Sequence, residues 1–210
     1  MSKAILFDVD GTLLDTTDWI LQAYLYVAQC QNEPLPRQLV LHEISLGGTL
    51  RGTYLKFFPT VPFDELREKH REYQDTHMDI VRAFPGVPET LKTLRENGIK
   101  LATMTNRLRD SSLKTMEYGG IKQYFDAFCC ADDVVNTKPD PEHVYAALRP
   151  LGIEPKDAIV VGDTSADIEA GQRAGARTVA ISHGAHADVE SLKPDYVIHR
   201  IEELLPIVLA

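Results

Sequence analysis

Both the fold and the candidate site are indicated by one stretch, Ile5-Leu6-Phe7-Asp8-Val9-Asp10-Gly11-Thr12-Leu13. Its three large apolar residues predict a buried strand of a parallel sheet, and Gly11 permits a tight turn after it. Ligands of open α/β sheets bind beyond the carboxyl ends of the strands, so we expect chemistry at Asp8 and Asp10. Two close carboxylates need a cation or a shared proton, and their oxygens suit Mg²⁺. Taken alone, the pattern also fits a strand that ends in a polar turn.

Composition narrows the possible functions. The chain has 210 residues, is 44% hydrophobic and 25% charged, and has a formal net charge of −9. That charge argues against non-specific binding to nucleic acid or to anionic membranes, so an anionic substrate needs a local positive pocket. We find no signal-peptide pattern and no apolar run near the ~20 residues of a membrane span. Cys30, Cys129 and Cys130 form no disulfide framework, and we therefore expect a reduced, cytoplasmic compartment.

Helical periodicity fills residues 16–81, where no strand pattern occurs. From Phe84 onward, predicted strands and helices alternate, which is typical of parallel βαβ units. The first strand needs partners, so it belongs with this second part. We therefore predict an α/β core of residues 1–15 and 82–210, with residues 16–81 as a helical insertion. Next to an acidic loop, such an insertion suits a lid that excludes water and selects substrates.

Three more polar clusters follow the ends of predicted strands. They contain Thr105 and Asn106, then Lys138 before a proline, then Asp163 and Asp167. Each has an ordinary structural explanation, as a turn cap, a solvated lysine or the N-cap of a helix. Nothing near Lys138 in the sequence indicates that it is part of the protein interior. Together with the first carboxylate pair, and all in strand-end loops, the clusters indicate a single site.

This combination resembles the haloacid dehalogenase superfamily over essentially the whole chain. Four motifs match: the D-x-D-G-T loop, the Thr-Asn pair, the lysine before a proline and the late G-D-x-x-x-D. The resemblance implies an α/β fold with a Rossmann-like parallel sheet in the strand order 5-4-1-2-3. It also implies that residues 16–81 are a type 1 helical cap.

The resemblance assigns the acidic residues to a Mg²⁺-dependent phosphatase reaction. Asp8 would be the nucleophile that forms an aspartyl-phosphate, and Asp10 the general acid and base. Mg²⁺ would be held by Asp8, the backbone carbonyl of Asp10 and Asp163. Asp167 would anchor the metal, either directly or through another group.

The remaining polar residues are expected to bind substrate. Lys138, the Thr105 hydroxyl and the Asn106 backbone N–H would hold phosphoryl oxygens. Arg51 follows the Gly47-Gly48 loop of the insertion, where the family places its specificity loop. We expect Arg51 to meet a second anionic group of the substrate.

The expected substrate is a small phosphorylated metabolite similar to phosphoglycolate, bound by a monomer or homodimer without nucleic-acid or membrane partners. A β-phosphoglucomutase-like phosphotransferase and an inorganic pyrophosphatase share these motifs and stay open. A hydrolytic dehalogenase is disfavoured because it normally lacks the second aspartate, Asp10. A non-catalytic phospho-acceptor signalling domain is a distant alternative, since it would lack the helical insertion and the late G-D-x-x-x-D.

Two other groups of residues are interpreted as structural. A His-x-x-His pattern at His183 and His186 invites a metal-site interpretation, but an exposed loop explains it better. Arg107 and Arg109 follow the Thr-Asn pair and are taken as surface residues, and the four histidines in predicted helices as packing or surface residues: His42, His70, His77 and His143.

Overall fold

The computed structural model describes residues 3–182, 191 and 193–209. Its centre is a six-stranded parallel sheet in the order β5-β4-β1-β6-β7-β8. The strands are β1 (Ala4–Phe7), β4 (Lys100–Met104), β5 (Ala127–Cys129), β6 (Ala158–Gly162), β7 (Arg177–Ile181) and β8 (Tyr196–Ile198). If the strands β1, β4, β5, β6 and β7 are numbered 1 to 5 in chain order, the sheet from β7 to β5 has the predicted order 5-4-1-2-3. Strand β8 lies outside β7. The predicted α/β fold is therefore confirmed.

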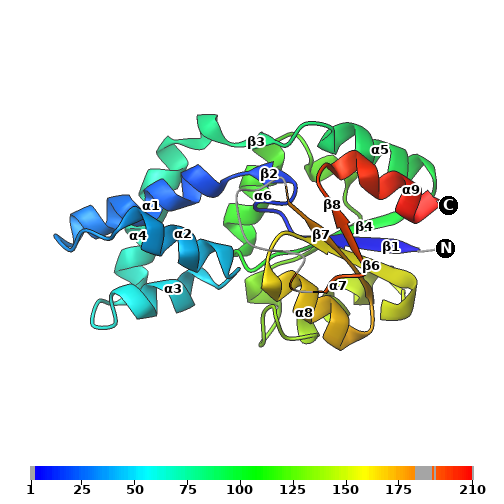
Figure 1. The fold of residues 1–210 in the computed structure, drawn as a ribbon. Helices are drawn as coiled ribbons and strands as arrows, with labels where there is room; N and C mark the ends of the chain where they lie inside the picture. Colours follow the sequence, from blue (N-terminus) through cyan, green and yellow to red (C-terminus); the bar gives the residue numbers. More distant parts are fainter. Residues whose placement is uncertain (1–2, 183–190, 192, 210) are drawn as a thin grey trace.

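Helices cover both faces of this sheet (Figure 1). Ile5 and Phe7 of β1 pack into one apolar cluster with side chains of α5 and α9, whereas Ala4 and Leu6 pack into a second cluster with α7. Burial on both faces explains why β1 is a continuous apolar run. The covering helices are α5 (Val87–Glu96), α6 (Arg109–Tyr118), α7 (Glu142–Leu148), α8 (Ser165–Ala174) and α9 (Leu204–Leu209).

Four helices form a separate lobe beside the sheet, at the left of Figure 1. They are α1 (Thr17–Cys30), α2 (Arg37–Ser45), α3 (Leu50–Phe57) and α4 (Phe63–Thr76). The lobe has its own apolar cluster, which includes Tyr24, Tyr54 and Leu66. Residues 16–81 are all described and contain no strand, as expected. The exact division into core and cap stays a prediction.

The two connections between lobe and sheet run side by side. β2 (Leu14–Asp15) pairs antiparallel with β3 (Arg82–Ala83), so that Leu14 faces Ala83 and Asp15 faces Arg82. The two strands directly flank the predicted helical insertion, residues 16–81. Strands of two residues are too short to show an alternating pattern, which is why the sequence did not predict them.

Two helices of the structure are followed by 3₁₀ turns. α4 stops at Thr76, and a 3₁₀ turn at Met78–Ile80 completes the segment expected to be helical to residue 81. α7 stops at Leu148 and continues as a 3₁₀ turn, since Pro150 has no N–H for an α-helical hydrogen bond. Within the described residues, no helix has the length and apolar character needed to cross a membrane. The cytoplasmic location stays a prediction.

Candidate active site

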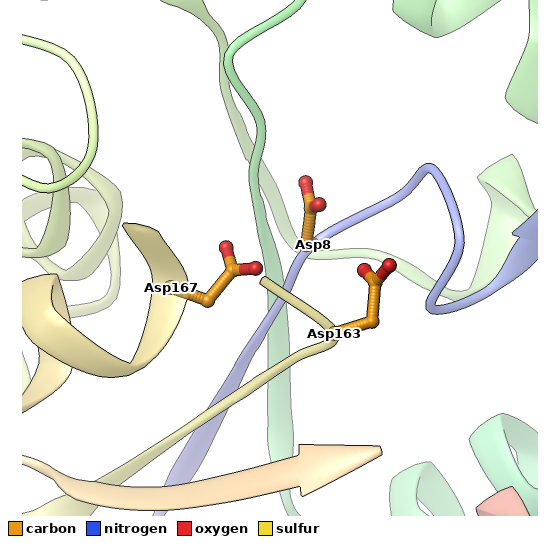
Figure 2. A group of neighbouring side chains, drawn as sticks. All are labelled: Asp8, Asp163 and Asp167. Atoms are coloured by element: carbon orange, nitrogen blue, oxygen red, sulfur yellow. The ribbon is translucent and has the colours of Figure 1, made fainter. Parts of the chain in front are cut away.

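Three acidic side chains converge beyond the carboxyl ends of β1 and β6 (Figure 2). Asp8 directly follows β1, Asp163 directly follows β6, and Asp167 lies in the first turn of α8. One carboxylate oxygen from each lies within 4.8 Å of the other two, and all three residues are buried. Adjacent parallel strands end at the same edge of the sheet, which is how residues so far apart in the sequence meet.

Lys138 supplies the positive charge inside this acidic cluster. Its Nζ lies 2.8 Å from Asp8 Oδ1 and 2.6 Å from Asp167 Oδ1, and its side chain is 2% exposed. The expectation that Lys138 is not part of the protein interior is therefore wrong. The other oxygen of Asp167 accepts hydrogen bonds from the backbone N–H and the hydroxyl of Thr164. Asp167 thus anchors both Lys138 and the start of α8.

Burial and mutual repulsion perturb the charged groups of the cluster. Burial raises the pKa of Asp8 to about 7; Lys138 opposes this rise and the Asp167 charge adds to it. Burial and the charge of Asp8 raise the pKa of Asp163 well above its usual value. Burial acts to lower the pKa of Lys138, but Asp167 and Asp8 outweigh it and raise that pKa. One lysine does not balance three buried carboxylates, so a further cation or proton is needed.

The carboxylate of Asp10 has its own hydrogen-bond partners, at the start of the first helix of the lobe and in the segment after β4. Its Oδ1 accepts hydrogen bonds from the Thr16 hydroxyl at 2.7 Å and from the Arg107 guanidinium at 2.9 Å. Arg107 also lies over the Trp19 ring, 4.9 Å from its centroid, and its side chain is only 14% exposed. Arg107 is therefore a partly buried partner of Asp10, and its interpretation as a surface residue is wrong.

The Asn106 side chain joins three parts of the molecule. Its Oδ1 accepts a hydrogen bond from the Lys138 N–H, and its Nδ2 donates to the carbonyls of Lys138 and Gly47. Gly47 belongs to the loop of the helical lobe, so Asn106 connects that loop to the segment that carries Lys138. Thr105 Oγ1 accepts the N–H of Arg107 at 3.2 Å.

A cavity of ≈ 390 Å³ opens onto these residues, between the sheet edge and the helical lobe. Six of the predicted site residues line it: Asp8, Asp10, Thr105, Asn106, Lys138 and Asp163. Asp167 is fully buried and contacts Lys138 from outside this lining. The structure thus brings together seven of the eight residues that the sequence singled out.

Arg51 is the exception, and the structure does not bring it to the site. It is exposed, its Cζ lies 5.2 Å from the centroid of the Phe63 ring, and it is not among the described residues that line the cavity. It lies in the first turn of α3, only three residues after Gly48, but that turn directs its side chain toward α4.

The helical lobe contributes other residues that the sequence did not single out. Arg67, His70, Arg71 and Gln74 of α4 all line the cavity. Their spacing of three, one and three residues places them on one face of a helix. That spacing was the available signal, but an exposed polar face has the same pattern. The His183 and His186 pattern lies outside the described residues.

Comparisons with known proteins agree with this geometry. The family model for haloacid dehalogenase-like hydrolases matches residues 5–181. The chain is 33% identical over 209 residues to the pyrophosphatase PpaX of Halalkalibacterium halodurans, covering 98% of this chain and 96% of the relative. Two solved structures are similar as well. A predicted phosphoglycolate phosphatase from Haemophilus somnus has a TM-score of 0.83 at 24% identity, covering 98% of this chain and 97% of that one.

The second structure is a putative β-phosphoglucomutase from Thermotoga maritima. It has a TM-score of 0.77 at 25% identity and covers 99% of this chain and 98% of that one. The family match spans all four sequence motifs, and residues from all four line one cavity. The chain therefore belongs to the haloacid dehalogenase-like hydrolase family, as a phosphatase.

Proposed function

We propose that this phosphatase is Mg²⁺-dependent and hydrolyses a small phosphorylated metabolite through an aspartyl-phosphate at Asp8. The observation that carries the proposal is the position of Asp8, which lines the cavity between Lys138 and Asp163. A carboxylate so placed can reach a phosphorus atom held by Lys138. We also propose residues 16–81 as the cap and residues 1–15 and 82–210 as the catalytic core, with the cavity between them.

The residues fit a hard divalent cation. Asp8 and Asp163 offer carboxylate oxygens, the donors that Mg²⁺ prefers, and their pKa values are raised by burial first and by the neighbouring carboxylates second. Gly11 leaves open the space beside the Asp163 carboxylate that a Cβ would fill. Asp8, Asp163 and the Asp10 carbonyl would hold the ion, and Asp167 would hold Lys138 in place beside it. When bound, Mg²⁺ supplies charge that offsets repulsion between phosphoryl oxygens and the carboxylates.

The reaction itself divides among the protein side chains. An oxygen of Asp8 attacks phosphorus as the bond from phosphorus to the leaving oxygen breaks, and Asp10 gives that oxygen a proton. Asp10 then takes a proton from the water that hydrolyses the aspartyl-phosphate. Lys138 and the Thr105 hydroxyl hold phosphoryl oxygens throughout. Arg107 positions the carboxylate of Asp10.

A phosphate-release screen over small phosphorylated metabolites tests the function directly. We expect turnover with Mg²⁺, none after exhaustive chelation, and none for Asp8→Asn, because an amide is a far poorer nucleophile. Asp157→Asn removes a carboxylate paired with Lys3 near the surface and is the matched control that should keep full activity. Full turnover after chelation, or a near-normal rate for Asp8→Asn, would contradict the proposed mechanism.

Pyrophosphate hydrolysis is the second candidate, because the PpaX relative is 33% identical over nearly the whole chain. Phosphoryl transfer between positions of a sugar is the third, and its support is the similarity to the β-phosphoglucomutase structure. Pyrophosphate belongs in the same screen. A sugar phosphate followed by phosphorus NMR separates isomerisation from release of free phosphate.

A further inference from the structure

One face of α4 forms part of the cavity wall contributed by the helical lobe. Arg67, His70, Arg71 and Gln74 line the cavity, while Leu66 of the same helix is buried in the apolar cluster of the lobe. The catalytic carboxylates and Lys138 line the same cavity from the sheet edge. A substrate whose phosphoryl group lies against the sheet edge therefore extends its leaving group toward the helical lobe.

Two of these residues are cations whose present partners are weakly held. Arg67 pairs with Asp64 at 3.0 Å and Arg71 pairs with Asp110 at 3.4 Å, and both aspartate side chains are 82% exposed. Exposed pairs contribute about 0–1 kcal/mol, so an anionic group of a substrate can replace them. The other lining cations are engaged differently: Lys138 and Arg107 pair with buried or partly buried carboxylates.

His70 lies between these two arginines in the sequence and is held rigidly. It is buried, its Nδ1 is 2.7 Å from the Tyr54 hydroxyl, and the Tyr24 ring packs edge-on with its centroid 4.9 Å away. Burial and the charge of Arg107 lower the pKa of His70 to about 3, so its imidazole is neutral near pH 7. When Tyr54 donates to Nδ1, the other ring nitrogen carries the proton and acts as a donor.

We propose that this face of α4 is the leaving-group subsite, and that Arg67 and Arg71, with His70 between them, select substrates that carry a second anionic group. A guanidinium binds a carboxylate or a phosphate through paired hydrogen bonds, and this chemistry indicates the class of substrate. The class comprises diphosphates and carboxylated phosphomonoesters, as opposed to phosphate esters of neutral alcohols. The inference rests on the proposed phosphatase function and transfers to α4 the role first expected of Arg51.

Steady-state kinetics on three substrates test the subsite. Pyrophosphate and 2-phosphoglycolate carry the second anion, and phenyl phosphate does not. Arg67→Gln and Arg71→Gln should each lower kcat/KM on the first two by about 10- to 100-fold, the loss of one charge-assisted hydrogen bond, and by less than about 3-fold on phenyl phosphate. Lys69→Gln removes a charge from the same helix outside the cavity lining and should leave kcat/KM unchanged on all three substrates.

The outcomes against the inference are equally specific. An equal loss on all three substrates would mean a damaged lobe, and a selective loss in Arg51→Gln but not in the α4 variants would return the role to Arg51. Either result overturns the subsite.

Calorimetry of 2-phosphoglycolate binding separates the inference from the chemistry. Measured in an Asp8→Asn background, Arg71→Gln should weaken binding by about tenfold or more. If the unmodified protein released no phosphate but this dependence held, the proposed reaction would fail while the subsite stood. Unchanged binding would overturn the subsite even in an active enzyme.

Discussion

Replacing Lys138 with methionine removes the charge between two buried carboxylates and keeps most of the side-chain volume. Nζ of Lys138 lies 2.8 Å from Asp8 and 2.6 Å from Asp167, and the side chain is 2% exposed. Removing one partner of a buried ion pair costs about 3–5 kcal/mol, because the remaining charge is left unpaired. For a chain of 210 residues, 1 kcal/mol corresponds to about 2–4 °C, so the melting midpoint should fall by about 6–20 °C.

The measurement is urea and thermal unfolding in the presence of a chelator, near neutral pH. Lys3→Met is the matched control, since Lys3 pairs with Asp157 at 3.0 Å with side chains 64% and 30% exposed, and it should cost less than about 1 kcal/mol. Adding Asp167→Asn to Lys138→Met removes one of the unpaired carboxylates and should recover about 1–3 kcal/mol. An unchanged midpoint for Lys138→Met, or no recovery in the double variant, would refute this account of the cluster.

Two further outcomes are expected. Asp10→Asn should lower turnover by about 10²–10⁴-fold with poor leaving groups and much less with good ones, because only the former need a proton; equal losses across a series of aryl phosphates would argue against a proton donor. His70 has a folded pKa of about 3, below its unfolded value of about 6.5, so the stability linked to it is complete above about pH 6.5 and is lost as pH falls. Between about pH 7.5 and pH 5 this loss is about 2 kcal/mol, and His70→Gln should remove it from the pH dependence of urea unfolding; an unaltered dependence would mean that His70 titrates normally.

The sequence predicted the fold well because its signals are local. The run Ile5-Leu6-Phe7 is apolar on both faces, and the structure buries it at the centre of the sheet. Helical spacing predicted that residues 16–81 form helices, and a strand-end rule predicted where Asp8 and Asp163 would lie. The residue at which an α-helix changes to a 3₁₀ turn, as before Pro150, does not follow from the sequence, because the two have nearly the same side-chain pattern.

The contacts that tune the site are long-range, and sequence spacing carries no information about them. Arg107 and Asp10 are 97 residues apart, and nothing near Arg107 distinguishes it from a surface arginine until β1 and β4 are placed side by side in the sheet. The same holds for Asn106, whose side chain reaches the Gly47 carbonyl 59 residues away. The expectation for Arg51 failed for a related reason. The rotation of α3 in the folded lobe decides which way this side chain faces, and the sequence does not give that rotation.

The sequence by itself determined the alternating α/β core, the inserted helices and the acidic strand ends, since each follows from side-chain periodicity or from the place where a parallel strand stops. Only the tertiary structure decided that Lys138 is buried between two carboxylates and that α4 turns Arg67, His70 and Arg71 toward the cavity. A helix with several polar faces can pack in more than one rotation, and the fit of its apolar residues into the lobe selects one.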